Sequence, residues 1–455
     1  MNYSKLDKFY LNTLETFQSN PENILTELVP DIHTVHDFLQ NLAPDSLKLD
    51  NLKLSWIKNK PGGDLRLLYT ARHKEPYFFF ARRLPFYKGK QYAMRMNQIF
   101  ARAIQRHERL KEFGRAAIYS TDLGFLFEFY PADRCLSTLI QTTDPEFMKL
   151  VLQQTLTQKT NGKKLHEVTI NSVQYKPERK CLLRYQLEWK NPDSKQLYYG
   201  KIFHKVRQVF VKKIRIFQHW QNSVFKIPEP VALLPGLNME LLSSIPGTHL
   251  SRLCTQDNFP DICSRIASGL LEFQKTPVTL PDMRRISEEI SQLKSWGNEF
   301  ALFWPQQAPL IHRLVDRLTG NLLQRWPSLP TPVHGDFHVA NILVDDNQLG
   351  LIDFENCFMG PPAIDVGSFY AQLKLLSLKT CKQHTALDES VHAFLDTYQT
   401  HCEPDARSML PTYCALSCLW CAYYQCLLRP VKPGWLERAH IMLELSERIL
   451  QTGEL

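Results

Sequence analysis

The stretch VHGDFHVANILVDDNQLGLIDFEN, from Val333 to Asn356, places many metal-binding and proton-accepting side chains in an otherwise apolar setting. Its runs of Val, Ile, Leu and Phe predict two short buried strands joined by a turn. A carboxylate inside an apolar strand is costly unless it is paired or bound to a metal. The side chains that this rule singles out are Asp336, Asn341 and Asp353.

The spacing of these three residues fits phosphoryl transfer from ATP. That reaction needs metal ligands for the β and γ phosphates, a carboxylate that accepts the acceptor's proton, and a lysine that fixes the α and β phosphates. Asn341 follows Asp336 by five residues, which is the base-to-ligand spacing of a kinase catalytic loop. Asp353 follows an apolar strand and is placed to be the second ligand. Such oxygen ligands suit Mg²⁺.

Three motifs in order, HGDFHVAN, LIDFE and GPPAIDVGSF, resemble the signature of the aminoglycoside phosphotransferase and choline kinase superfamily. The resemblance extends from Val168 to about Leu450. It implies an α+β, protein-kinase-like two-lobed fold with a small antiparallel β N-lobe and a mainly helical C-lobe. It also implies ATP and Mg²⁺ as cofactors and a small-molecule hydroxyl acceptor.

The resemblance also implies roles for single residues. Asp336 is expected to be the general base, Asn341 and Asp353 to hold Mg²⁺, and Asp365 to brace the catalytic loop. Two histidines, His334 and His338, are interpreted as loop-shaping or simply buried residues. The remaining polar residues of the stretch have the composition of a solvated turn and are Asp345, Asp346 and Asn347.

Lys201, in YYGKIFHK, is the candidate phosphate-binding lysine, because it follows two strands that the pattern predicts to pair. The alternative is a lysine on an edge strand that only extends its ammonium group to water. In protein kinases a glutamate on the next helix orients this lysine. The segment 206–226 contains no acidic residue, so either another element supplies the carboxylate or Lys201 is held differently.

Two further segments are expected to face the nucleotide. The turn KPERK is not glycine-rich, and Lys176, Arg179 and Lys180 are predicted to cover the phosphates with side-chain charge, with a solvated basic turn as an equal alternative. NMELLSS resembles the hinge that binds adenine through main-chain groups, with Glu240 and Leu242 near the contact.

The predicted domains are an N-terminal accessory domain (1–150), a kinase-like N-lobe with its hinge (151–248) and a helical C-lobe (249–455). Residues 1 to about 50 are predicted to be helical, followed by strands up to Leu84. KPGGDLRLLY in the accessory domain aligns with KPERKCLLRY in the N-lobe. The accessory domain is therefore interpreted as a degenerate copy of the N-lobe, a cap over the acceptor site or an oligomerisation element, and the oligomeric state stays open.

The amino-acid composition indicates which binding partners and which cellular location to expect. The net charge of +8 is spread along the chain, so nucleic-acid binding is not demanded. Eleven irregularly spaced cysteines and the absence of a signal peptide or an 18-residue apolar run predict a cytoplasmic protein without a membrane segment. In the helix-like run 413–426, the cysteines at 414, 418 and 421 have the spacing of an iron–sulfur motif but are interpreted as core thiols.

The prediction is an ATP- and Mg²⁺-dependent phosphotransferase acting on a sugar, an amino alcohol or an aminoglycoside-like molecule. The sequence does not identify the acceptor, and a sugar is favoured only because the N-terminal region resembles, in outline, the cap of maltokinase-like sugar kinases of this superfamily. The alternative is a pseudokinase that binds nucleotide or a partner protein without turnover. A protein-directed kinase has less support, because GPPAID follows Asp353 within a few residues and leaves no room for a peptide platform.

Overall fold

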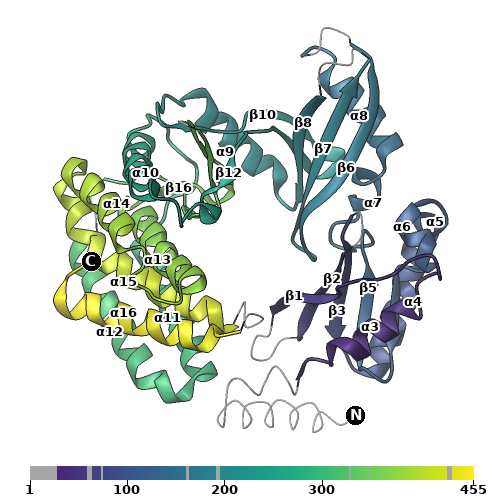
Figure 1. Ribbon diagram of the computed structural model, residues 1–455, viewed down its shortest axis with the longest axis horizontal. Coiled ribbons are helices and arrows are strands. Elements are labelled where there is room, and N and C mark those ends of the chain that lie inside the picture. Colours follow the sequence, from purple (N-terminus) through teal and green to yellow (C-terminus); the bar gives the residue numbers. More distant parts are fainter. Residues whose placement is uncertain are drawn as a thin grey trace. The chain divides into compact units, whose positions relative to one another are not determined.

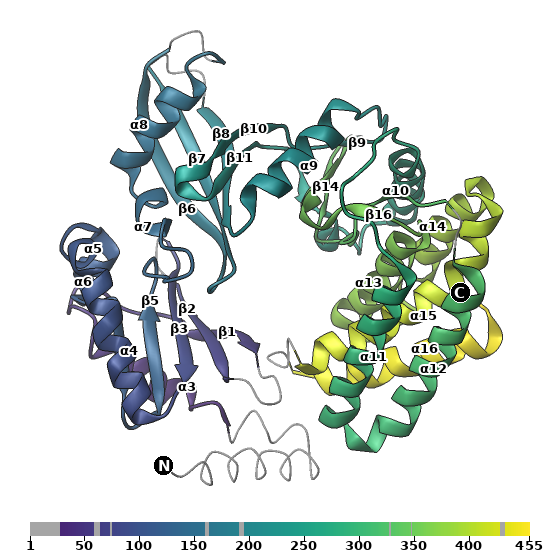
Figure 2. The same ribbon diagram turned by 180° about the vertical axis from the view of Figure 1, so that it is seen from behind.

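The computed structural model describes residues 28–58, 64–72, 75–159, 163–190, 195–326, 329–346, 348–427 and 433–455 (Figures 1 and 2). The first predicted helix and most of the predicted turns PGGD and NPDS lie outside these residues. The chain divides into two compact units. We call residues 23–210 and 229–244 the sheet unit, and residues 211–228 and 245–455 the helical unit. This division confirms the predicted α+β class.

The sheet unit begins with α3 (Ile32–Gln40) and a five-stranded antiparallel sheet. The strands are β1 (Lys53–Lys58), β2 (Arg66–Ala71), β3 (Tyr77–Arg83), β4 (Ala117–Ser120) and β5 (Phe125–Phe129). Three helices connect β3 to β4, namely α4 (Phe86–Ile99), α5 (Ala101–Arg106) and α6 (Glu108–Phe113). The spatial order is β1-β2-β3-β5-β4.

A second five-stranded antiparallel sheet follows in the same unit. Its strands are β6 (Leu165–Lys176), β7 (Lys180–Trp189), β8 (Lys195–Phe203), β10 (Pro230–Leu234) and β11 (Met239–Ser243). Its order is β6-β7-β8-β11-β10, which repeats the order of the first sheet strand for strand. A helix, α9 (Val206–Gln218), again follows the third strand. The two sheets that the sequence pairs by self-similarity thus share one topology.

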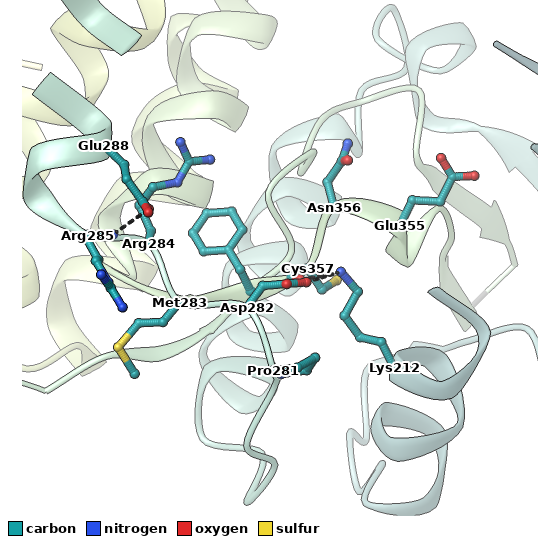
Figure 3. A pocket seen from close by; sticks show the side chains of 11 residues that line it. Lys212, Pro281, Asp282, Met283, Arg284, Arg285, Glu288, Glu355, Asn356 and Cys357 are labelled. Carbon is teal, nitrogen blue, oxygen red and sulfur yellow. Dashed lines mark hydrogen bonds and ion pairs between the residues drawn. The ribbon is translucent and has the colours of Figure 1, made fainter. Parts of the chain in front are cut away.

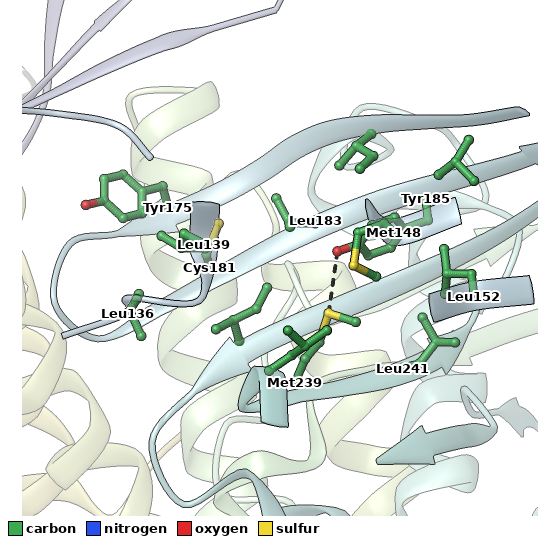
Figure 4. Close-up of a cluster of buried hydrophobic side chains, with 14 of the residues drawn as sticks. Leu136, Leu139, Met148, Leu152, Tyr175, Cys181, Leu183, Tyr185, Met239 and Leu241 are labelled. Atoms are coloured by element: carbon green, nitrogen blue, oxygen red, sulfur yellow. Dashed lines mark hydrogen bonds between the residues drawn. The ribbon is translucent and has the colours of Figure 1, made fainter. Parts of the chain in front are cut away.

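The core of the second sheet lies on the face that two helices cover (Figure 4). These helices are α7 (Leu139–Thr142) and α8 (Pro145–Leu156), and the Asp144 carboxylate caps α8 by accepting from two backbone N–H groups. Because strand side chains alternate, β7 turns Cys181, Leu183 and Tyr185 toward the helices and the residues between them to the other face. The second face therefore carries Leu182 and Arg184 of β7.

The helical unit confirms the predicted helical character of the chain beyond Ser251. Its helices are α10 (Phe259–Gln274), α11 (Ile286–Phe303), α12 (Ala308–Arg325), α13 (Ala363–Thr380), α14 (Asp388–His401), α15 (Pro404–Leu427) and α16 (Trp435–Thr452). A small sheet has the order β12 (Thr248–His249), β14 (Ile342–Asp345), β15 (Gln348–Leu351) and β9 (Phe225–Lys226). A two-stranded ribbon joins β13 (Thr331–Val333) to β16 (Phe358–Gly360).

The cysteines of helix α15 lie in the core of the helical unit. Cys414, Cys418 and Cys421 are buried free thiols, and burial raises the pKa of each. Raised pKa values oppose the thiolate form that binds metals, which agrees with the interpretation as core thiols. Across the described residues, no helix is both long and apolar enough to cross a bilayer.

Candidate active site

The opening stretch forms a loop between β13 and the β14–β15 hairpin. Because β14 and β15 are antiparallel, the hairpin returns Asp353 to the end at which Asn341 begins. The Ile352 N–H donates to the Asn341 carbonyl at 3.0 Å. The two predicted metal ligands therefore lie at one end of the same hairpin.

Asp365 holds the loop from the first turn of α13. Its buried carboxylate accepts from the His334 N–H at 2.7 Å and from the Gly335 N–H at 2.9 Å. Burial raises the pKa of Asp365 to about 7, although both hydrogen bonds act in the opposite direction. Two buried backbone donors thus find their acceptor in one side chain, which is the bracing contact that the resemblance implies.

Gly335 lets the loop approach the chain that follows Asp353. Its φ is +74°, and a Cβ there would lie 2.5 Å from the Asn356 carbonyl oxygen and 2.9 Å from the Phe358 ring. Glycine satisfies both the backbone angle and the close contact. The residue before Asp336 is therefore packed directly against segment 356–358.

Asp336 is half-exposed and pairs with His338, whose Nε2 lies 3.1 Å from its carboxylate. His338 Nδ1 accepts from the Ala340 N–H, so Nε2 carries the hydrogen and donates to Asp336. Burial raises the pKa of Asp336, but the hydrogen bond and the electrostatic attraction of His338 act against burial, and the pKa is lowered below the ordinary aspartate value. His338 is predicted to be a loop-shaping or buried residue, and its position two residues after Asp336 is the signal in the sequence for this pairing.

Asn341 and Asp353 have the donor set of a Mg²⁺ site. The Asn341 Nδ2 donates to the Asp336 carbonyl at 2.9 Å, which leaves the amide oxygen as the group that can bind a cation. Asp353 has a left-handed backbone (φ 71°, ψ 55°), which aspartate tolerates better than most residues. Its negative charge acts to raise the pKa of Asp336, against the net lowering.

Within the described part of the chain, no three His, Cys, Asp or Glu side chains form a metal cage. Mg²⁺ does not require one, since it commonly binds through one or two carboxylates together with phosphate oxygens and water. The Nε2 of the buried His334 donates to the Ile352 carbonyl at 3.1 Å, while its buried Nδ1 has no hydrogen-bond partner within the described residues. Burial lowers the pKa of His334 to about 4, so the ring is neutral and serves to pack the loop.

The predicted nucleotide-side residues belong to the sheet unit. Lys201 on β8 lies directly opposite Glu240 on β11, and both are buried on the face opposite to α8. Opposed residues of an antiparallel pair share a face, so Glu240 lies beside Lys201, whereas α9 contains no acidic residue. Leu242 is half-buried on β11, and Lys176 and Arg179 flank the β6–β7 turn.

A cavity of about 650 Å³ opens in the helical unit beside segment 355–358 (Figure 3). It is lined by Lys212, Pro281, Asp282, Met283, Arg284, Arg285, Glu288, Glu355, Asn356, Cys357 and Phe358. Lys212 Nζ donates to the Cys357 carbonyl at 2.7 Å and pairs with Asp282 at 3.1 Å. Phe358 also pairs with Val333 of β13, so this cavity wall adjoins the strand that leads to Asp336.

Residues 193–401 match the model of the phosphotransferase enzyme family. A methylthioribose kinase from Bacillus velezensis is 35% identical over 92 residues, which cover 18% of this chain and 23% of that protein. A methylthioribose kinase from Geobacillus sp. is 33% identical over 86 residues, covering 17% and 22%. The chain thus spans less than a quarter of these curated relatives. The aminoglycoside phosphotransferase APH(4)-Ia, as a thermostable mutant in apo form, gives a TM-score of 0.44 at 13% identity over 66% of this chain and 99% of that one.

Proposed function

Because residues 193–401 belong to the phosphotransferase enzyme family, we propose that this protein is an ATP- and Mg²⁺-dependent kinase that phosphorylates a hydroxyl group of a sugar-like small molecule. The family match confirms the superfamily and the kinase-like fold that the three motifs predict. All eleven cysteines are free thiols, which suits a cytoplasmic location. The observation that carries the proposal is that the Asn341 amide donates to the Asp336 carbonyl and that the β14–β15 hairpin returns Asp353 to the end at which Asn341 begins.

Each of these residues has a distinct part. Asp336, kept ionised by His338, orients the acceptor hydroxyl and accepts its proton. The Asn341 amide oxygen and the Asp353 carboxylate would hold Mg²⁺, which neutralises phosphate charge when bound. Lys201, opposite Glu240, provides the cation for the α and β phosphates. Lys176 and Arg179 would cover the phosphates, and the strand end at Leu242 would adjoin adenine.

The cavity in the helical unit supports a neutral, polyhydroxylated acceptor. Its lining contains three cationic residues (Lys212, Arg284 and Arg285) and three carboxylates (Asp282, Glu288 and Glu355), so the two signs balance. A sugar needs donors and acceptors side by side, whereas a cationic aminoglycoside favours an excess of carboxylates. An ammonium alcohol favours a cage of aromatic rings. The one aromatic ring of this lining, Phe358, is covered by the Arg284 guanidinium at 4.8 Å.

The direct test measures ADP formation with Mg²⁺ and ATP against matched panels of sugars, amino alcohols and aminoglycosides. The proposal expects turnover with members of the sugar panel and none without an added acceptor beyond slow hydrolysis. Turnover confined to amino alcohols or aminoglycosides would remove the sugar assignment and keep the kinase. Nucleotide binding without turnover on any panel would favour the alternative, a pseudokinase.

Replacing Arg285 with alanine is expected to raise KM for the acceptor roughly tenfold, the order of effect of one lost charge-assisted hydrogen bond. The KM for ATP should stay unchanged, since the residue lines the cavity of the helical unit. Steady-state kinetics with each substrate varied in turn separates the two constants. Arg313→Ala is the matched control, because Arg313 is an exposed α12 arginine paired with Glu447. Equal acceptor KM values in both variants would contradict this placement of the acceptor.

Replacing His338 with alanine is expected to move the acid limb of the kcat/KM profile to higher pH. The hydrogen bond and charge of His338 lower the pKa of Asp336, so their loss lets this carboxylate protonate earlier as the pH falls. The pH dependence of kcat/KM between pH 4 and pH 8 measures the shift. His249→Ala serves as the control, because His249 contacts the same loop through the Ala340 carbonyl. An unmoved acid limb in His338→Ala would contradict the pairing.

A further inference from the structure

The turn between β6 and β7 is held by the first sheet of the sheet unit. Glu178, at the tip of this turn, accepts a hydrogen bond from Arg66 of β2 at 2.7 Å. Its carboxylate also lies 3.4 Å from Arg82 of β3 and 3.4 Å from Arg134. The Glu178 side chain is only 9% exposed. Three arginines from the N-terminal region therefore surround one carboxylate of the predicted phosphate-covering turn.

The backbone of the turn is held as well. The Glu178 N–H donates to the Asp133 carboxylate at 2.8 Å, and the Tyr175 hydroxyl donates to the same oxygen at 2.8 Å. Asp133 is buried, and its other oxygen accepts from the backbone N–H groups of Cys135 and Leu136. The anchor is thus itself fixed by its own loop, so the turn is attached through main chain and side chain together.

The backbone conformation of Glu178 favours glycine, and the contacts of its carboxylate explain why the turn carries a glutamate instead. Pro177 occupies the second position of the turn, Glu178 the third with a φ of +60°, and the Arg179 N–H donates to the Lys176 carbonyl at 3.0 Å. This is the pattern of a type II turn, in which glycine is usual at the third position. A residue with a Cβ costs on the order of 1 kcal/mol there. Glycine would remove that cost but would also remove the carboxylate that meets the arginines.

Glu178 contacts Arg82 on the third strand of the first sheet, and Lys201 lies on the third strand of the second sheet. In the second sheet, buried Lys201 on the third strand faces buried Glu240 on the fifth. In the first sheet, buried Arg82 on the third strand pairs with buried Glu128 on the fifth at 2.7 Å. Tyr92 of α4 lies against Arg82, with the guanidinium 4.7 Å from its ring centroid. The corresponding position in the first sheet is thus filled by a protein carboxylate.

We propose that the N-terminal region is a second copy of the nucleotide-binding lobe. It positions the β6–β7 turn, which belongs to the nucleotide-binding lobe itself, for ATP, and Glu178 is the positioning residue. This inference rests on the proposed function, because it takes that turn as the one that covers the phosphates. Lys176, Arg179 and Lys180 are presented by a turn that is fixed in advance. A flexible glycine-rich loop becomes ordered only when nucleotide binds. In this protein the contacts with the neighbouring sheet order the turn before nucleotide binds.

The test compares Glu178→Gln and Arg66→Gln with the wild type in three measurements. Titration with a fluorescent ATP analogue and Mg²⁺ gives the nucleotide Kd, steady-state kinetics separate KM for ATP from kcat, and limited trypsin digestion reports cleavage after Arg179. We expect Kd and KM to rise about tenfold if the loosened turn is competent one-tenth of the time. Cleavage after Arg179 should accelerate, while kcat at saturating ATP changes less than KM. Glu188→Gln is the control, since it breaks the Lys195–Glu188 pair on the β7–β8 side of the same sheet.

Each outcome decides one question. A wild type that binds no nucleotide overturns the proposed function and this inference with it. A wild type that binds, together with folded variants that bind equally well, overturns the positioning role alone, whether or not trypsin cleavage accelerates. If Glu178→Gln fails to fold, Arg134→Gln gives the answer, because Arg134 is 46% exposed and its loss leaves two arginines on Glu178. It should weaken nucleotide binding in the same direction and to a smaller extent, and unchanged binding would overturn the positioning role.

Discussion

Replacing Asp336 with asparagine is expected to lower kcat by about 10²–10⁴-fold, the contribution typical of a positioned general base. An amide has nearly the same shape as a carboxylate but does not accept the acceptor's proton. Its oxygen still accepts the hydrogen bond from His338, so we expect the melting temperature and the Kd for ATP to stay near the wild-type values. Single-turnover kinetics at saturating ATP, alongside nucleotide titration, measure both quantities.

Asp345→Asn is the matched control for this variant. Asp345 is an exposed residue at the end of β14, and its substitution removes the same charge from the same stretch of chain. We expect its kcat to equal that of the wild type. Should Asp336→Asn retain the wild-type kcat as well, Asp336 is not the base, and the pseudokinase or another catalytic group becomes the better interpretation.

Replacing Gly335 with alanine is expected to destabilise the protein by about 2–4 kcal/mol, adding the strain of a positive φ to that of an overpacked contact. The added Cβ would lie 2.5 Å from the Asn356 carbonyl, and a backbone atom does not move aside as a flexible side chain does. Relief of the clash displaces Asp336 from segment 356–358, so activity should fall more than the fraction of folded protein. Urea unfolding and kcat, both measured at a temperature where the variant is folded, separate these effects.

Gly320→Ala provides the contrast. Gly320 lies inside α12, and a Cβ there would meet no heavy atom within 4 Å. Alanine in a helix interior is favoured over glycine by roughly 0.5–1 kcal/mol, so this variant is expected to be slightly more stable and equally active. Similar losses in both variants would show that the loop at Gly335 tolerates a side chain, contrary to the observed packing.

Local patterns in the sequence were sufficient to predict the elements around the site. The alternation in CLLRYQLEWK predicts β7, and the apolar run before Asp353 predicts β15. The spacing of Asp336 and Asn341 predicts their contact, since a loop of five residues keeps them close. These signals are short-range, and the residues that produce them lie within a few positions of each other.

The contacts that local patterns do not specify join distant parts of the chain. Glu240 is predicted to lie near the hinge, and the structure also places it opposite Lys201, because β11 enters the sheet beside β8. Only the strand order shows that neighbour. Glu178 likewise meets Arg66, which lies 112 positions earlier. The basic turn KPERK was interpreted through its positive charges, whereas its one acidic residue makes the contacts that fix it.

The contacts of Glu178 with the arginines of the first sheet and of the loop after it also have an evolutionary consequence. A carboxylate that is largely removed from water is stable only when it is paired with its arginines. A recombination that exchanged one of the two sheets for that of another protein would therefore leave Glu178 or its arginines without a partner. Positions 66, 82, 133, 134 and 178 are therefore expected to be inherited as one block. Homologues that lost the leading sheet should carry glycine or another small residue at the tip of this hairpin.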